Sequence, residues 1–138
     1  MARRKIYITR SDATKLEELL KDGLRRNRLD HANLLALKEE LQRAKIVAPT
    51  EVTPDVVTMH STVRVRDQDG EESEVTLVFP EEADPVEGRV SVVAPMGVAM
   101  LGYKAGDKVK FRTPGGERQI EILEVVYQPE AAGQELQA

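Results

Sequence analysis

The spacing of hydrophobic residues changes once along this chain, and the change predicts two differently folded parts. Up to residue 48, leucines recur every three or four residues, as they do on one face of an amphipathic helix. Pro49 and Pro54 then prevent a helix from continuing. Beyond them hydrophobic and polar residues alternate, as in a half-buried strand. We therefore expect an α+β protein, with one part at residues 1–48 and a second at residues 49–138.

The first part is predicted to be a short antiparallel helical hairpin, or coiled coil. One helix is expected over residues 11–23, capped by Ser11 or Thr9 and stopped by Gly23. A second is expected to begin at Asp30, after a connection short enough to make the two helices antiparallel neighbours. The apolar seam of the second helix is Leu34, Leu37, Leu41 and Ala44.

The second part is predicted to be a mostly antiparallel sheet with one short helix. Strands are expected over residues 57–66, 74–79, 89–93, 108–112 and 118–127, and the helix over 95–102. In the turn at residues 113–116, Pro114 suits the first corner and a glycine with positive φ the second. The tail from Gln128 to Ala138 shows no periodicity, so we expect it to fray.

The net charge of −4 hides a division between the two parts. Residues 1–48 carry 12 basic and 7 acidic side chains, a net +5, whereas residues 49–138 carry 8 and 17, a net −9. An anionic surface repels nucleic-acid phosphates, so the second part is expected to meet a protein. The basic residues Arg25, Arg26 and Arg28 fall at the predicted hairpin tip, where they serve either solubility or contact with phosphates or acidic groups.

Several functional classes receive no support from the residues. The chain has no Cys and two His, His31 and His60, with no metal-ligand spacing and no catalytic pattern. No apolar run approaches the roughly 20 residues of a membrane helix, and no signal-peptide core follows the basic N-terminus. We expect a cytoplasmic protein with no enzymatic activity, no metal or cofactor and no membrane contact.

An apolar stretch precedes and enters the predicted short helix, at a corner of the sheet. Its small and apolar side chains make it a candidate protein-docking site. The candidate residues are Pro95, Met96, Gly97, Val98 and Ala99.

The same stretch resembles a known family. Residues 93–107, with Ala-Pro-Met-Gly, Ala-Met-Leu-Gly and Gly-Asp in succession, are similar to the C-terminal domain of Gre-type transcription factors, as are residues 113–125. Residues 55–61, 76–80 and 127–133 look like the Rnk group of that superfamily, the regulators of nucleoside diphosphate kinase. His60 stands where that group usually has Asn.

The resemblance implies an FKBP-like C-terminal domain and an N-terminal coiled coil. In Gre factors the C-terminal domain binds RNA polymerase at the rim of its secondary channel, and acidic residues at the coiled-coil tip help to hold a catalytic magnesium for transcript cleavage. In this sequence the tip at residues 23–30 is rich in Arg and lacks the paired acidic residues, and the hairpin is shorter. The resemblance thus implies a polymerase-binding transcription regulator that docks through Pro95–Ala99, competes with Gre-type factors and does not stimulate cleavage.

Two other functions stay open at this stage. An FKBP-like fold is compatible with peptidyl-prolyl isomerase activity, although the chain holds only 3 Tyr and 2 Phe to line a proline pocket. An RNA- or nucleotide-binding module would use the Arg-rich tip, and its affinity would fall steeply with salt. Within a transcription complex, contact with nucleic acid is expected to be indirect.

Overall fold

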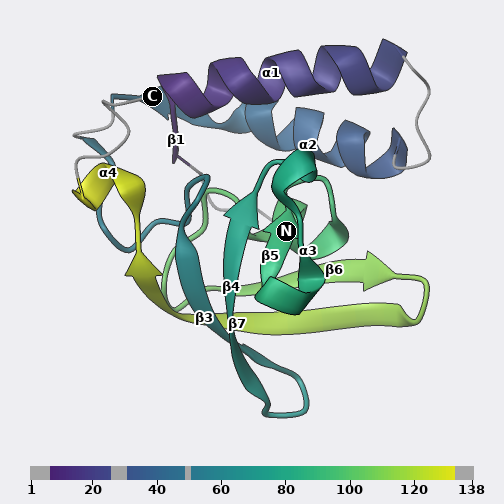
Figure 1. Ribbon diagram of the computed structural model, residues 1–138, viewed down its shortest axis with the longest axis vertical. Coiled ribbons are helices and arrows are strands. Elements are labelled where there is room, and N and C mark those ends of the chain that lie inside the picture. The colour runs from purple at the N-terminus through teal and green to yellow at the C-terminus, as the bar shows by residue number, and fades with distance from the viewer. Residues whose placement is uncertain (1–6, 26–30, 49–50, 133–138) are drawn as a thin grey trace.

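The hairpin and its neighbouring strands make up the first part of the fold. The computed structural model describes residues 7–25, 31–48 and 51–132 (Figure 1). Helices α1 (Arg10–Arg25) and α2 (His31–Arg43) pack side by side, and β1 (Tyr7–Thr9) pairs in parallel with β2 (Lys45–Val47). The predicted hairpin is confirmed, and the two strands bring its two ends together.

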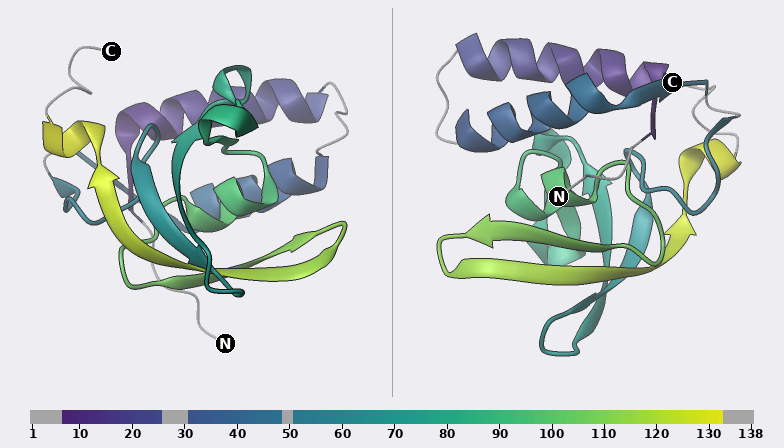
Figure 2. Two further views of the ribbon diagram at one scale, coloured as in Figure 1. Left: turned by 60° about the horizontal axis from the view of Figure 1, so that its bottom comes forward. Right: turned by 180° about the vertical axis from the view of Figure 1, so that it is seen from behind.

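A curled five-stranded sheet forms the second part, in the order β5-β4-β3-β7-β6. Every pairing is antiparallel except that of β4 with β5. In Figures 1 and 2 the hairpin lies on one side of this sheet, with α3 between α2 and the strands. The α+β fold is therefore confirmed. The elements are β3 (Thr62–Asp67), β4 (Glu72–Val78), the 3-10 helices η2 (Pro80–Glu82) and η3 (Pro85–Glu87), β5 (Arg89–Ser91), α3 (Pro95–Met100), β6 (Lys108–Thr113), β7 (Gly116–Tyr127) and α4 (Pro129–Ala132).

One hydrophobic core joins the hairpin to the sheet. Leu16 and Leu37 of the hairpin are fully buried in the same cluster as Leu77 and Ile122 of the sheet. The seam residues Leu34 and Leu37 are fully buried, as their spacing predicts. The division into two domains, at 1–48 and 49–138, stays a prediction.

The first helix begins as expected and ends later than expected. Its cap is Thr9, whose Oγ1 accepts a hydrogen bond from the Asp12 N–H at 3.2 Å. Gly23 does not stop the helix, which continues to Arg25. A Cβ on Gly23 would lie 2.7 Å from Leu34 Cδ1, so this glycine lets α1 and α2 approach closely. The predicted start of the second helix at Asp30 lies outside the described residues.

The strand predicted over residues 57–66 is wrong in its first half, because β3 begins at Thr62. Ser61 Oγ accepts a hydrogen bond from the Thr58 N–H at 2.9 Å, and the Ser61 N–H donates to the Thr58 carbonyl at 3.0 Å. This local turn replaces the strand. His60 takes a left-handed φ of 68° within it, a conformation that His and Asn adopt more readily than most residues.

The end of the sheet differs from the predicted pattern at the turn before β7 and at the tail after it. The positive φ of the last hairpin turn falls at Gly116, at 118°, not at Gly115. A β-bulge shifts the pairing of β7 with β3, so that Val125 turns towards the core and Glu124 to solvent. The tail does not fray over residues 128–132, where Gln128 is buried and α4 follows.

No helix among the described residues is both long enough and apolar enough to cross a membrane.

Candidate docking site

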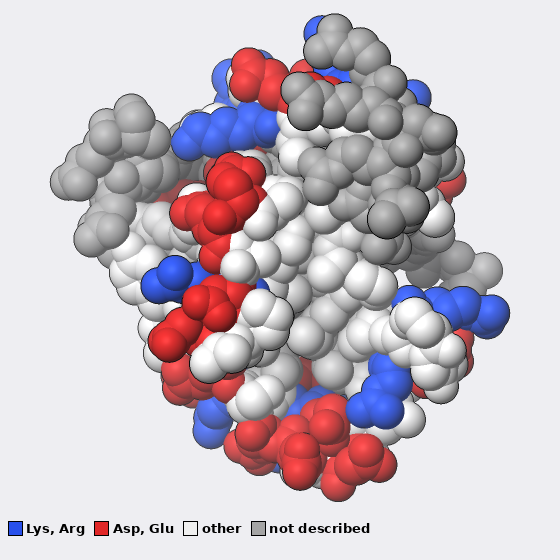
Figure 3. Space-filling view, turned by 45° about the vertical axis from the view of Figure 1, so that its right-hand side comes forward, with Lys and Arg blue, Asp and Glu red and all other residues white. Residues whose placement is uncertain are grey.

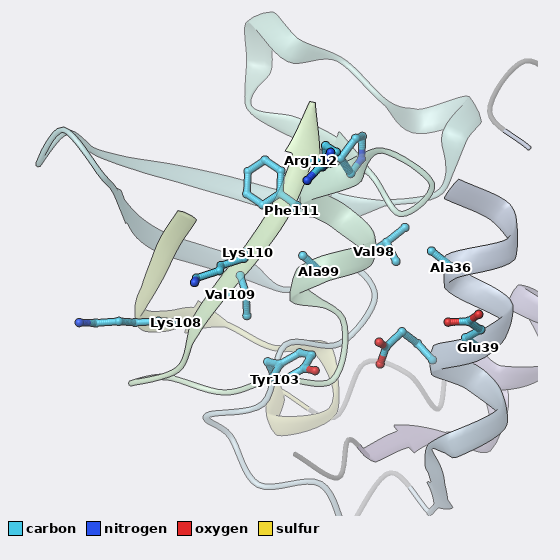
Figure 4. A pocket seen from close by; sticks show the side chains of 12 residues that line it. Ala36, Glu39, Val98, Ala99, Tyr103, Lys108, Val109, Lys110, Phe111 and Arg112 are labelled. Carbon is cyan, nitrogen blue, oxygen red and sulfur yellow. The ribbon is translucent and has the colours of Figure 1, made fainter. Parts of the chain in front are cut away.

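A groove of about 520 Å³ lies between α2, α3 and β6 (Figure 4). Its floor is apolar, and its α2 wall carries acidic side chains. Tyr103 and Arg112 lie at opposite ends of the view. The lining residues are Ala36, Glu39, Glu40, Pro95, Val98, Ala99, Tyr103, Lys108, Val109, Lys110, Phe111 and Arg112.

The local sequence fixes helix α3 at the side of this groove. Pro95 occupies the first turn, where its missing N–H loses no helical bond, after Ala94 in an extended conformation. Gly97 packs against the backbone of β5, because a Cβ there would overlap the Ser91 carbonyl oxygen. The short helix is therefore held rigidly against the sheet.

The structure divides the predicted docking residues between the groove and the core. Pro95, Val98 and Ala99 line the groove. Gly97 is buried against the sheet, and the half-buried Met96 packs onto the core. The stretch is thus less exposed than its residue types suggest, since a helix of six residues must bury one side to be stable.

The two walls of the groove come from different parts of the chain. Glu39 and Glu40 of α2 form an acidic wall, and Val109 and Phe111 of β6 form the opposite, apolar side, whereas Lys108 and Lys110 point away from α2 (Figure 4). Arg43 Nη2 donates to a Glu40 carboxylate oxygen at 2.5 Å and to the Tyr103 hydroxyl at 3.0 Å. The bond to Tyr103 fixes α2 to the loop after α3, and sequence reasoning missed it because the two partners lie 60 residues apart.

A second polar junction joins the start of α1 to the sheet. An Asp12 carboxylate oxygen accepts a hydrogen bond from the Met59 N–H at 3.2 Å. Burial, and next the charge of Glu130, raise the pKa of Asp12 to about 6. Glu130 in turn accepts a hydrogen bond from the Thr58 hydroxyl at 2.6 Å.

The Arg-rich tip is only partly described. Arg25 is the last residue of α1, whereas Arg26 and Arg28 lie outside the described residues. His60 Nε2 contacts Glu82 Oε1 at 2.8 Å on the surface, and its ring lies 5.7 Å from that of Phe79. The side chain of His31 lies outside what the structure describes. In the described part of the chain, no group of three His, Cys, Asp or Glu could hold a metal ion.

Charge on the sheet is concentrated away from the groove. Acidic side chains gather at the lower end of the face in Figure 3, the level of the β3–β4 turn. Arg64 and Arg66 on β3 form ion pairs with Glu72, Glu121 and Glu124 on the neighbouring strands. The exposed side of the sheet is therefore a charged surface without an apolar patch on β3.

Comparisons with known proteins match both parts of the chain. Residues 51–127 match the family "Transcription elongation factor, GreA/GreB, C-term", and residues 4–47 match "Rnk N-terminus". The chain is 41% identical to the regulator of nucleoside diphosphate kinase of Escherichia coli strain K12, over 96% of this chain and 97% of that protein. It is 40% identical to transcription elongation factor GreA of Shouchella clausii, over 64% of this chain and 57% of that protein.

A solved structure has the same fold. The prokaryotic transcription elongation factor GreA/GreB from Nitrosomonas europaea superposes with a TM-score of 0.75 at 42% identity, covering 89% of this chain and all of that one. Its likeness extends over the hairpin as well as the sheet, because so much of both chains is covered.

Proposed function

Because the chain belongs to the GreA/GreB family of transcription factors, and within it to the Rnk group, we propose that it regulates transcription by binding RNA polymerase without stimulating transcript cleavage. Membership supports a role in transcription regulation. The near-complete coverage of the regulator, against 57% of GreA from Shouchella clausii, favours the Rnk group over the cleavage factors.

We infer that the docking surface is the α3 side of the groove. Pro95 and Ala99 are half-buried there, beside the apolar floor made by Val98 and Val109. An apolar floor beside an acidic wall suits a protein segment better than a nucleic acid, because phosphates would meet Glu39 and Glu40. The observation that carries this inference is the open groove on a helix rigidly held by Gly97.

The absence of cleavage activity is proposed from the sequence of the tip. Magnesium is held by carboxylates, and a tip with Arg25, Arg26 and Arg28 repels a cation. The proposal places the hairpin at the secondary channel of the polymerase, where it would exclude Gre-type factors instead of reproducing their chemistry.

The test is co-elution of the purified protein with bacterial core RNA polymerase on a size-exclusion column. We expect the wild type to co-elute and the double variant Pro95→Glu with Met96→Glu to lose binding. Since Met96 also packs on the core, the single variant Ala99→Glu at the groove serves as a second test. Val86→Glu, at a side chain that is 92% exposed and does not line the groove, is the control. Failure of the wild type to co-elute, or unchanged binding of both groove variants, would overturn the proposal.

A further inference from the structure

Among the residues that the structure describes, strand β6 is an edge of the sheet, and half of its backbone groups have no backbone partner. It pairs only with β7, from Lys108 opposite Glu121 to Thr113 opposite Gly116. The Ile122 N–H donates to the Asp107 carbonyl at 2.9 Å. Because residues bonded to the partner strand alternate with residues that are not, residues 109, 111 and 113 direct their backbone groups to β7. Residues 108, 110 and 112 therefore direct their N–H and C=O groups to the free edge.

The side chains of these three residues are all cations, and all three are exposed. Lys108, Lys110 and Arg112 form no ion pair or side-chain hydrogen bond with any residue that the structure describes. Glu121, which lies opposite Lys108, contacts Arg66 at 3.6 Å instead. In a part of the chain with a net charge of −9, this edge carries three cations without a direct ion pair among the described residues, although Glu121 and Glu117 stand opposite Lys108 and Arg112 on β7.

The other face of the same strand is apolar. Val109 is buried and Phe111 is half-buried, and both line the groove beside Val98 and Ala99 of α3. A chain segment lying along the free edge would thus meet cations on one of its faces and the apolar groove on the other. Glu39 across the groove would repel acidic side chains directed inward.

We propose that the free edge of β6 binds an extended segment of a partner protein in which acidic and apolar side chains alternate. The segment adds to the sheet as a further strand, with its backbone bonded to residues 108, 110 and 112. Its acidic side chains pair with Lys108, Lys110 and Arg112, and its apolar side chains lie beside Val109 and Phe111. This inference goes beyond the proposed function, because it holds whichever protein supplies the segment.

A second copy of the chain does not fit the same edge. If two β6 strands paired with each other, cations would lie opposite cations, which is destabilising. Lysines on edge strands also discourage indiscriminate pairing. The charges therefore select against the protein itself and in favour of an acidic strand.

The experiment uses the full chain labelled with ¹⁵N and the peptide acetyl-Glu-Val-Glu-Ile-Glu-Val-Glu-amide, with a peptide carrying Lys in place of every Glu as control. We expect the acidic peptide to slow amide hydrogen exchange at Lys108, Lys110 and Arg112, and the basic peptide to leave it unchanged. The triple variant K108E/K110E/R112E should bind the acidic peptide at least about tenfold more weakly. The variant K21E/K38E/K45E makes the same change in net charge elsewhere and should bind as the wild type does.

Four results would overturn the proposal. The first is that the acidic peptide does not bind, and the second is that both triple variants weaken its binding equally. The third is that the peptide slows amide hydrogen exchange only in α2 or α3. The fourth is that light scattering shows concentration-dependent self-association through β6. Thermal unfolding checks that each variant is folded. If K108E/K110E/R112E does not fold, the single variant Lys110→Glu replaces it. We expect this variant to lose less affinity for the acidic peptide than the triple variant, and an unchanged affinity would contradict the proposal. Polymerase is absent from this assay, so its outcome is independent of the proposed function.

Discussion

Arg43 on α2 donates a hydrogen bond from Nη2 to the Tyr103 hydroxyl, 3.0 Å away, and this bond ties the helical hairpin to the loop that follows α3. Arg43 also pairs with Glu40, which is largely buried. Because Glu40 and Tyr103 both line the groove, the contact holds its two sides in fixed positions. The hairpin is thus part of the groove's construction.

Replacing Tyr103 with Phe removes the hydroxyl and leaves the Arg43–Glu40 pair in place. We expect the free energy of unfolding to fall by about 0.5–1.5 kcal/mol, the usual net contribution of such a bond. Urea denaturation measures the change. Tyr7→Phe is the matched control, since Tyr7 is 36% exposed, and an equal loss in the two variants would contradict a specific role for the Tyr103 bond.

Asp12 makes stability depend on pH. Burial first, and Glu130 second, raise its pKa from 3.8 to about 6 in the folded protein. In the unfolded chain the Asp12 carboxyl releases its proton at a lower pH than in the folded protein. Between pH 3.8 and about 6 the folded state therefore binds more protons than the unfolded state. The stability contributed by protonated Asp12 is full below pH 3.8 and is lost as the pH rises through 6.

Asp12→Asn should therefore be more stable than the wild type at pH 7, by on the order of 2 kcal/mol, and similar to it at pH 3.5. Its amide oxygen can still accept the Met59 N–H. Urea denaturation across this pH range gives the comparison, and NMR titration of Glu130→Gln should show a lower pKa for Asp12. Parallel pH profiles for wild type and Asp12→Asn would show that Asp12 is not the group responsible.

Gly97 is expected to be intolerant of any side chain. A Cβ at this position would overlap the Ser91 carbonyl oxygen, which belongs to the backbone of β5 and cannot rotate away. We predict that Gly97→Ala destabilises the fold by about 1–3 kcal/mol and weakens polymerase binding by displacing α3. Gly115→Ala is the control, because the nearest atom outside its neighbours is Thr113 Oγ1 at 3.7 Å. Equal melting temperatures for the two variants would refute the close packing of α3.

Gln128 anchors the segment after β7. It is 3% exposed, and its Nε2 donates to the carbonyls of Thr53 at 2.8 Å and Val56 at 2.7 Å. Gln128→Ala leaves the buried Val56 carbonyl without this donor and should reduce the free energy of unfolding by about 2 kcal/mol. Gln42→Ala, on the exposed side of α2, should change it by less than about 0.5 kcal/mol. Denaturation curves that rank the two variants in the opposite order would show that the anchor is unimportant.

Local pattern predicted the elements whose interactions are local. The leucine spacing located both helices and the buried seam of Leu34 and Leu37, because a helix face follows directly from sequence period. The prediction of a strand over residues 57–61 was wrong because the hydrogen bonds between Thr58 and Ser61 replace the strand pairing there. The alternation of hydrophobic residues carries no information about bonds from side chains to the backbone. Gln128 was assigned to a fraying tail because its hydrogen-bond partners are 72 and 75 residues away, where no local pattern can reveal them.

The candidate site was predictable only in part. Residue types pointed to the stretch at Pro95–Ala99, and the resemblance to Gre-type factors gave that stretch a role. The groove itself was not predictable, since Glu39 and Val109 come to line one cavity only through the packing of α2 and β6 on α3. Only the Gly-Gly and Pro signals of the β6–β7 turn hinted that β6 would lie at the end of a hairpin.

Transcript cleavage by a GreA factor in a backtracked RNA polymerase complex, titrated with this protein, tests the proposed function most directly. If the protein occupies the polymerase without cleavage chemistry, cleavage should fall to the level seen without GreA, and Pro95→Glu with Met96→Glu should fail to reduce it. Cleavage that persists at saturating protein, or that the protein itself stimulates when GreA is absent, would contradict the account.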